Sequence, residues 1–533
     1  MIKRSEVINE FYDVHMHAYN LSHPSLALIM MRIVKEMFGN KSEKEKEKWK
    51  DVMRLLLEFI YKKNPIVRTF QVVFLLLVFL FIPIAIFNIS HYIFAFTGNI
   101  LSILIASIIL VIIICCITIL MRNKLHKSFR FVSHALNVLF LMDYSLDEYF
   151  LTIESEIKDN DIFKDKDVNI TLCPQMMDFS GIDDSVSHMI WDKDIFEKPK
   201  YLPRNKPFID QEIDLMKGIQ NYYYEKNNSG EKKLLTILPF RGFEITEQMT
   251  ISKLNIILDK HFEDLPQGKD NREKAIYNAI VNYNMNENIG LSRGNYSGST
   301  EKCYIYAGFK VYPPLGFEVW PENSPKQRMM VKFYKTCIKN NIPIMIHCGS
   351  NVAGTVVNND YLELTKPMQW DNVFDNKEYN FKKLKICFAH FGVNKFEYLK
   401  ETFDPDNDWK HKIIEMCIQY ENVYVDISCR GTVAEVYFEI DMYIQSILKD
   451  PFAIDKINSK LIGKTMSSKQ MIEKLLSRIL FGTDFPMCCF TVNSYSKYLD
   501  ELDKGINSNN PIMNNEMYQM MTRDNCKRFL FGD

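Results

Sequence analysis

The sequence predicts an α/β protein of the (β/α)8 barrel class, also called a TIM barrel, with a helical module inserted after its first strand. Short apolar runs alternate with amphipathic helical stretches, and eight such runs can be counted. Strands that alternate with helices form parallel sheets, and eight of them favour a closed barrel. A long charge-free stretch between the first two runs predicts the insertion.

The eight predicted strands are short and apolar. The first ends in Asp13-Val14-His15-Met16-His17. The other seven are Val168–Cys173, Leu234–Phe240, Tyr304–Lys310, Ile342–His347, Lys385–His390, Val423–Ile427 and Arg478–Asp484. Amphipathic helices are expected between them at Gln248–His261, Asn271–Tyr283, Ser324–Asn340, Trp409–Tyr420 and Ser467–Ser477.

The charge-free stretch Thr69–Met121 contains no Lys, Arg, Asp or Glu. It divides into two apolar helices near residues 66–88 and 99–121, each close to the roughly 20 residues that cross a bilayer. Basic residues flank the pair on both outer sides and are missing from the link between the helices. The positive-inside rule therefore predicts a multi-pass membrane protein whose catalytic domain is cytoplasmic. The alternative is a buried helical hairpin, in which so long a charge-free run is uncommon.

Three segments follow from this pattern. Residues 1–20 hold the first barrel strand, residues 21–160 form the inserted helical module with its two transmembrane helices, and residues 161–533 form the rest of the barrel. The net charge is −1, which favours no nucleic-acid partner. The twelve cysteines are scattered without a Cys-x-x-Cys pair, which indicates reduced thiols rather than a zinc ribbon or a disulfide framework.

Several polar side chains stand where predicted strands end. His15 and His17 alternate with Asp13 on the first strand, so the three share a face, and two such imidazoles can bind one metal ion. The later strands end in, or near, Lys310, His347, His390 and Asp484. Chemistry in this barrel class gathers at the C-terminal strand ends, so we expect these residues to share one site. For His390 a hydrogen-bonded core role is the plain alternative.

These segments resemble the amidohydrolase superfamily of metal-dependent hydrolases, and most closely its branch of decarboxylases and lactonases. The matching pieces are Asp13–His17, Gly308–Pro313, Ile346–Gly349, Ala389–Gly392 and Gly482–Pro486, with Asn525–Leu530 similar to the branch's closing helix. The resemblance covers about Phe11–Asn20 and Val168–Asp533 and leaves out the insertion.

The resemblance implies a ligand set. His15, His17 and His347 would bind a divalent metal, with Asp484 as a further ligand or as the partner of the metal-bound water. Imidazoles with a carboxylate suit zinc, with manganese or iron as alternatives, and one or two ions are expected. His390 would bind a second metal, polarise the substrate carbonyl or shuttle protons. Lys310 is either carboxylated and bridges two ions, or is an unmodified ammonium that contacts substrate, which we favour.

The expected activity is metal-dependent hydrolysis of a C–N or C–O bond, of amide or lactone type, by a metal-activated water. Asp484 would move protons, with His390 and Lys310 as further catalytic residues. The alternative is a non-oxidative decarboxylase on the same barrel, and a third reading is a binding or scaffold module. Expected partners are a small-molecule substrate, the lipid bilayer and, as an open alternative, further copies of the chain. Lesser site candidates are Asp178, Arg241, Tyr312, Glu318, Trp320, Asp426 and Ser428.

Overall fold

The computed structural model describes residues 9–19, 134, 137–138, 141–142, 144–164, 166–177, 208–230, 234–243, 249–284, 302–322, 324–349, 361–392, 408–461, 463, 465–506 and 509–532. The chain divides into two units, and all described residues belong to the unit made of Met1–Arg32, His134–Met189 and Pro203–Asp533. The segment boundaries predicted at residues 20 and 160 stay a prediction.

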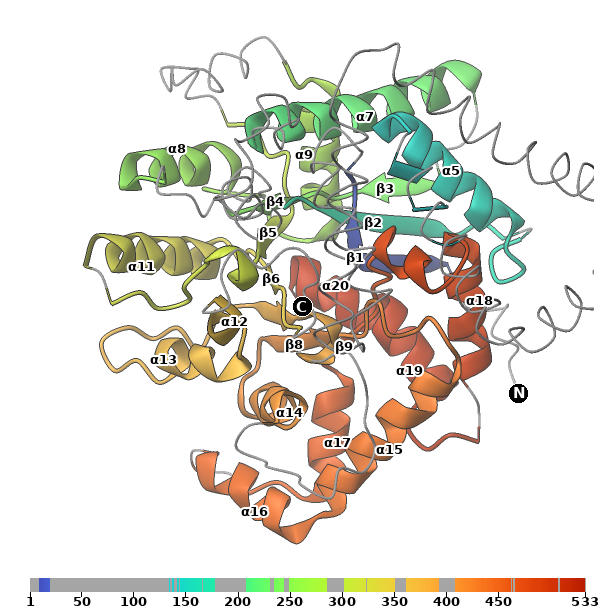
Figure 1. The fold of residues 1–533 in the computed structure, drawn as a ribbon. Coiled ribbons are helices and arrows are strands. Elements are labelled where there is room, and N and C mark those ends of the chain that lie inside the picture. Colours follow the sequence, from blue (N-terminus) through green and yellow to red (C-terminus); the bar gives the residue numbers. More distant parts are fainter. Residues whose placement is uncertain are drawn as a thin grey trace, which may run out of the picture. The chain divides into compact units, whose positions relative to one another are not determined.

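The described strands form one parallel sheet that winds into a nearly closed barrel (Figure 1). Their order is β1-β2-β4-β5-β6-β7-β8-β9, with β3 paired to β2. Their bounds are β1 Glu10–His17, β2 Asn169–Gln175, β3 Leu235–Ile237, β4 Phe240–Gly242, β5 Gly308–Val311, β6 Ile344–Ile346, β7 Ile386–Phe388, β8 Val423–Asp426 and β9 Ile479–Leu480. Each lies within one of the eight predicted runs or overlaps it.

The ring closes where the chain after β9 runs along β1. The Val14 N–H donates to the Phe481 carbonyl at 3.2 Å, and the Thr483 N–H donates to the His15 carbonyl at 3.1 Å. The third predicted strand is split into β3 and β4, because Pro239 lies between them and has no N–H to donate to a ladder. Counting that pair as one position gives eight, so the barrel prediction is confirmed.

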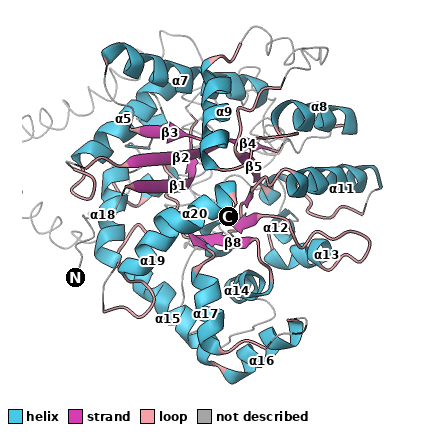
Figure 2. Cartoon of the chain, turned by 180° about the vertical axis from the view of Figure 1, so that it is seen from behind, coloured by secondary structure: helices cyan, strands magenta, loops and turns pink. Residues whose placement is uncertain are grey.

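Helices surround the strands on the outside of the barrel (Figure 2). The longer ones are α5 Leu146–Asp159, α7 Phe208–Ser229, α8 Ile251–His261, α9 Lys269–Val281, α11 Ser324–Lys339, α14 Trp409–Gln419, α15 Glu435–Lys449, α16 Pro451–Lys460, α17 Ser468–Leu476 and α18 Tyr495–Gly505. The short ones are α12 Tyr361–Leu364, α13 Asp371–Phe374, α19 Asn515–Gln519, α20 Asn525–Phe531 and the single turns η2 Pro313–Leu315, η3 Pro367–Trp370, η4 Ala389–Gly392, η5 Met487–Phe490 and η6 Met520–Asp524.

Side-chain caps begin several of these helices. The Thr250 hydroxyl accepts from the Lys253 N–H at the start of α8, and the Asp408 carboxylate accepts from the His411 N–H at the start of α14. Ser467 forms a capping box at the start of α17. Such caps satisfy N–H groups that a first helical turn leaves unbonded, which stabilises a helix by about 1 kcal/mol.

Side chains along each strand point alternately outward, toward the helices, and inward, into the barrel, so the core has an outer and an inner layer. On β5, Phe309 points outward, where its ring stacks on Phe262 with centroids 4.1 Å apart and meets Phe333 edge-on at 4.9 Å. Lys310, the next residue, points into the barrel. Fully burying a phenylalanine contributes roughly 1.5–3 kcal/mol, so the outward apolar layer fixes α8 and α11 to the sheet. The inward layer is free to carry polar groups at its C-terminal end.

The predicted membrane localisation is corrected. Among the helices of the described part of the chain, none is long and apolar enough to cross a bilayer. A span needs about 20 predominantly apolar residues. The longest described helix, α7, has 22 residues but carries charges that include Asp210, Lys217 and Lys226. The stretches near residues 66–88 and 99–121, predicted as transmembrane helices, lie outside the described residues. The multi-pass membrane localisation is therefore not retained.

Candidate metal centre

The predicted site residues meet at the C-terminal end of the barrel. His15 and His17 are on β1, Lys310 is on β5, His347 follows β6, His390 lies in η4 after β7, and Asp484 follows β9. His15, His17, Lys310, His390 and Asp484 are buried, whereas His347 is partly exposed. Residues that are up to 469 positions apart thus form one polar group inside an apolar barrel.

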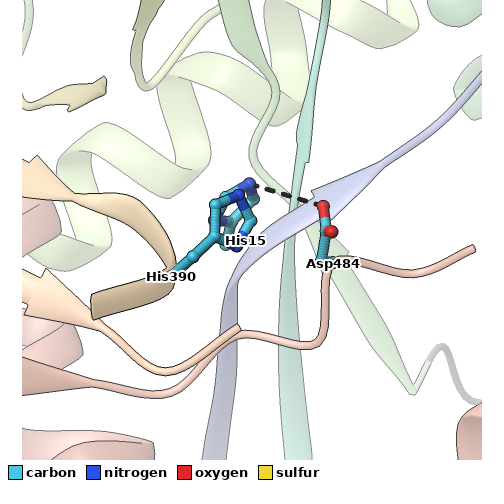
Figure 3. A group of neighbouring side chains, drawn as sticks. All are labelled: His15, His390 and Asp484. Atoms are coloured by element: carbon cyan, nitrogen blue, oxygen red, sulfur yellow. Dashed lines mark ion pairs between the residues drawn. The ribbon is translucent and has the colours of Figure 1, made fainter. Parts of the chain in front are cut away.

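The tightest part of this group is His15, His390 and Asp484 (Figure 3). One ligand atom from each lies within 4.8 Å of the others, and His15 Nε2 is 3.7 Å from Asp484 Oδ1. His17 Nε2 lies 3.2 Å from the same oxygen. His347 Nδ1 lies 3.2 Å from His390 Nε2. All five predicted ligands are therefore connected, and His390 is nearer the centre than the sequence implied.

His15 is oriented by Asp426 and Ser428 at the end of β8. Its Nδ1 lies 2.9 Å from Asp426 Oδ2 and 2.8 Å from Ser428 Oγ. Burial raises the pKa of Asp426, but His15, His390 and Ser428 outweigh burial and hold that pKa below its usual value. An ionised carboxylate only accepts, so His15 carries its proton on Nδ1 and presents a lone pair at Nε2. Supporting roles were expected for both β8 residues.

His17 presents a lone pair for a similar reason. Its Nδ1 lies 2.9 Å from the Gln175 carbonyl oxygen, which can only accept, so Nδ1 carries the proton. Its Nε2 then faces Asp484 Oδ1. Burial raises the pKa of Asp484, but His17, His390 and His15 outweigh burial and keep that carboxyl ionised. Two acceptors in contact repel each other unless a cation or a proton lies between them.

His390 and His347 form a chain that ends in an unbonded nitrogen. His390 Nδ1 lies 3.2 Å from the Ser428 carbonyl oxygen and therefore carries the proton. Burial lowers the pKa of His390 to about 3, so its ring is neutral and its Nε2 accepts from His347 Nδ1. This leaves His347 Nε2 buried without a hydrogen-bond partner among the described residues.

This donor set fits a divalent metal. Nε2 of His15 and Nε2 of His17 lie 3.7 and 3.2 Å from Asp484 Oδ1, and His347 Nε2 is a buried nitrogen without a hydrogen-bond partner among the described residues. Buried polar atoms are seldom left unsatisfied, so the unbonded His347 Nε2 fits a bound cation at this position. Imidazole nitrogens and a carboxylate oxygen are ordinary ligands for zinc and related ions.

Lys310 lies directly beside one predicted ligand. Its Nζ is 3.0 Å from His15 Nε2. Burial lowers the pKa of Lys310 to about 8, and Asp426 and Asp484 act in the opposite direction. The lysine is therefore part of the same group and reaches it from β5, as expected.

Two further candidates lie on different sides of the barrel wall. Tyr312 reaches the group, with its ring 4.2 Å from the ring of His347. Arg241 does not, because it pairs in register with the outward-facing Phe309. Its guanidinium packs 4.7 Å from the ring centre of Phe208 and 3.7 Å from a carboxylate oxygen of Glu212 on α7. Arg241 thus joins α7 to the barrel.

The remaining candidates are elsewhere. Trp320 packs against Phe381, and Glu318 pairs with Lys326 at 3.9 Å on the surface. Asp178 lies outside the described residues. One contributor was missed by sequence reasoning, the Gln175 carbonyl that orients His17. The parallel register of β1 and β2 pairs these two residues, so a correct register would have found it.

A comparison with protein-family models agrees with this picture. A family model described as Amidohydrolase matches residues 304–504, the part of the chain that carries Lys310, His347, His390 and Asp484. No curated protein matches the sequence. One similar solved structure, from Acinetobacter baumannii, is described as a 2-pyrone-4,6-dicarboxylic acid hydrolase; it is 10% identical, with 73% of this chain and 89% of that chain covered and a TM-score of 0.31. Another, from Staphylococcus aureus, is described as an amidohydrolase; it is 12% identical, with 73% of this chain and 92% of that chain covered and a TM-score of 0.32.

Together with the parallel barrel and the group of ligand-type side chains at its C-terminal end, the family match identifies the protein as an enzyme of the amidohydrolase type.

Proposed function

We propose that the protein is a metal-dependent hydrolase that cleaves a C–N or C–O bond, of amide or lactone type, in a small-molecule substrate. One observation carries the proposal, namely that Nε2 of His15 and Nε2 of His17 lie 3.7 and 3.2 Å from the same carboxylate oxygen of Asp484. His15, His17, His347 and Asp484 would hold the ion, for which zinc is our first choice. A bound divalent ion polarises a carbonyl and lowers the pKa of water toward neutrality.

Asp484 is the proposed proton carrier. Its carboxyl is ionised at neutral pH, because the surrounding histidines hold its pKa below the usual value despite burial. It can therefore accept a proton from the attacking water and return it to the leaving nitrogen or oxygen. Its backbone N–H donates to the His15 carbonyl at 2.7 Å, which fixes the carboxylate beside the ligand histidines.

His390 is proposed to relay protons and to orient His347. Its Nδ1 proton is held by Ser428, and its Nε2 is an acceptor. A neutral ring in this tautomer cannot donate from Nε2 to a substrate carbonyl, so the geometry favours relay over polarisation of the carbonyl.

Lys310 is proposed to be unmodified and to contact a polar or anionic group of the substrate, with one ion bound per chain. Metal analysis tests this directly. Two ions per chain, of which one is lost in Lys310→Ala, would contradict it and support the carboxylated lysine. The buried ammonium also favours a second candidate activity, non-oxidative decarboxylation, because it can hold a substrate carboxylate.

The deciding experiment combines metal content with a substrate screen. The purified full-length chain is assayed for bound metal and for turnover of amides, lactones and carboxylated compounds. Hydrolysis without carbon dioxide supports the first activity, and release of carbon dioxide supports the second. His261→Gln is a matched control for the histidine variants, because His261 is also buried but bonds the Cys303 carbonyl away from the site. Wild-type protein without metal, and unchanged cellular function in the double variant His15→Ala, His17→Ala, would instead support a scaffold.

A further inference from the structure

Asp13 is a fully buried carboxylate two residues before His15. Its Oδ1 accepts from the His15 N–H at 3.2 Å and from the Thr483 N–H at 3.1 Å. Its Oδ2 accepts from the Thr483 hydroxyl at 2.6 Å and from the Tyr495 hydroxyl at 3.1 Å. Four donors from three segments of the chain therefore meet on one side chain, and both of its oxygens are occupied.

These contacts join the two arms that carry the predicted ligands. One arm is the end of β1, with His15 and His17. The other is the turn after β9, where Thr483 precedes Asp484. The carbonyl of His15 accepts from the N–H groups of both turn residues, at 3.1 Å from Thr483 and 2.7 Å from Asp484. Asp13 adds a side-chain link at the same junction.

The turn it holds is one that the chain would not favour by itself. Asp484 has φ 60°, in the left-handed region that side chains other than glycine rarely adopt. Such a residue persists where its surroundings hold it there. The three bonds from Asp13 to Thr483 and Tyr495 fix the residue immediately before it. Without them, the turn can relax and carry the Asp484 carboxylate away from the histidines.

We propose that Asp13 is a positioning residue for the metal centre, which it serves by holding the β1 arm and the Asp484 arm at the separation that a divalent ion needs. Asp13 is not itself a ligand, because its oxygens are committed to N–H and O–H donors. This proposal rests on the proposed metal-dependent function. It assigns to a buried carboxylate a role in metal affinity in addition to its role in folding.

The test compares Asp13→Ala and Asp13→Asn with a matched control, Glu212→Gln. Glu212 is also buried, and its carboxylate accepts hydrogen bonds from the hydroxyls of Tyr306 at 2.5 Å and Tyr283 at 3.1 Å. Unlike Asp13, it lies on α7, outside the barrel. The full-length proteins are loaded with Co²⁺ as the probe. Affinity is measured by competition with a chelator, and ligand geometry is followed by the absorption spectrum of the bound cobalt.

We expect Asp13→Ala to bind Co²⁺ about 10- to 100-fold more weakly, as is typical when a residue that supports metal ligands is removed. Its cobalt spectrum should also change. Asp13→Asn should fall between Asp13→Ala and the wild type, because its one oxygen still accepts the two backbone N–H groups. Glu212→Gln should lose stability while its affinity and spectrum stay those of the wild type.

If Asp13→Ala does not fold, Tyr495→Phe serves instead, because it removes a single donor from Oδ2 and keeps the ring. A folded Asp13→Ala or Tyr495→Phe protein with wild-type affinity and spectrum overturns the positioning role alone. Wild-type protein that binds neither Co²⁺ nor Zn²⁺ overturns the proposed function as well. The two failures are therefore distinguishable in one experiment.

Discussion

Asp426→Asn perturbs the hydrogen bonds that set the proton positions of the ligand histidines. Asp426 Oδ2 accepts from His15 Nδ1 at 2.9 Å, and Oδ1 accepts from the N–H groups of His390 and Ser428 at 2.9 and 3.0 Å. Asparagine keeps the shape but replaces one oxygen with an NH2 donor. If the remaining oxygen keeps the two backbone donors, the NH2 faces His15. His15 must then move its proton to Nε2, the atom predicted to bind the metal.

The magnitude follows from the bond that is lost. A hydrogen bond to a charged group contributes roughly 1.5–3 kcal/mol to stability. About 1.4 kcal/mol corresponds to a tenfold change in an equilibrium constant. Both side chains are fully buried, so solvent screens this interaction little. We therefore expect metal affinity to fall by roughly 10- to 100-fold, with catalytic efficiency at limiting metal falling in parallel.

The assay is competition for Zn²⁺ with a chromogenic chelator, together with circular dichroism to establish folding. Asp441→Asn is the matched control, since Asp441 is a buried aspartate on α15 outside the site. It should lose some stability and keep the wild-type metal affinity. Folded Asp426→Asn protein with unchanged affinity for Zn²⁺ would refute the tautomer argument, since the wrong His15 tautomer could not bind as well.

Three further changes test other parts of the structure. Gly482→Ala should weaken metal binding and destabilise the fold by about 1–3 kcal/mol, because a Cβ there would lie 2.6 Å from the His15 Cβ; unchanged Zn²⁺ affinity would contradict this. Phe262→Ala should cost about 3–5 kcal/mol in thermal or urea unfolding and leave metal content per folded chain unchanged, because its ring packs on the outer layer. Burial lowers the pKa of His261 to about 3, so the unfolded chain takes up a proton below its ordinary pKa of 6.5 and the folded chain does not until near pH 3. The stability that neutral His261 contributes is thus complete above pH 6.5 and falls by up to about 1.4 kcal/mol per pH unit below it. The urea midpoint of His261→Gln should therefore depend less on pH between 6.5 and 4.5, and identical slopes would count against this explanation.

The strands were predictable because each is a short apolar run that must be buried on both faces of a parallel barrel. The run Val423–Ile427 corresponds to β8 at Val423–Asp426 almost residue for residue. Strand ends were less predictable. The run Tyr304–Lys310 begins four residues before β5. An apolar composition indicates that residues are buried, but it does not indicate which of them form hydrogen bonds with a neighbouring strand. The membrane localisation inferred from the charge-free run is corrected, because no helix among the described residues is long and apolar enough to cross a bilayer.

The site was predictable as a set of residues and not as an arrangement. Because His15, His347, His390 and Asp484 all stand at the ends of predicted strands, the sequence alone predicted that they share one site. The central place of His390 depends on a turn in which its φ is 61°, and no local pattern of the sequence indicates that turn. Arg241, a lesser candidate for the site, points away from it in the structure. Its outward direction follows from pairing with Phe309, and register between strands cannot be read from one strand alone.

Three residues with left-handed backbone conformation help to bring several strand ends together in one compact site. His390, Cys429 and Asp484 have φ of 61°, 59° and 60°, and they come shortly after β7, β8 and β9 respectively. Each is held by a bond from its own N–H to a neighbouring strand end. His390 donates to the Asp426 carboxylate at 2.9 Å, Cys429 to the Thr483 carbonyl at 3.2 Å, and Asp484 to the His15 carbonyl at 2.7 Å.

Such conformations cost of order 1–3 kcal/mol each and persist only where the surroundings hold them. Here the partner of each turn lies on, or next to, another strand end of the same site. Disturbing one ligand arm therefore loosens the turn that aims the next. For this reason, and because both side chains bond His15, we expect paired substitutions at Asp13 and Asp426 to deviate from additivity in metal affinity. Additive losses in a double-mutant cycle would show that the two arms are set independently.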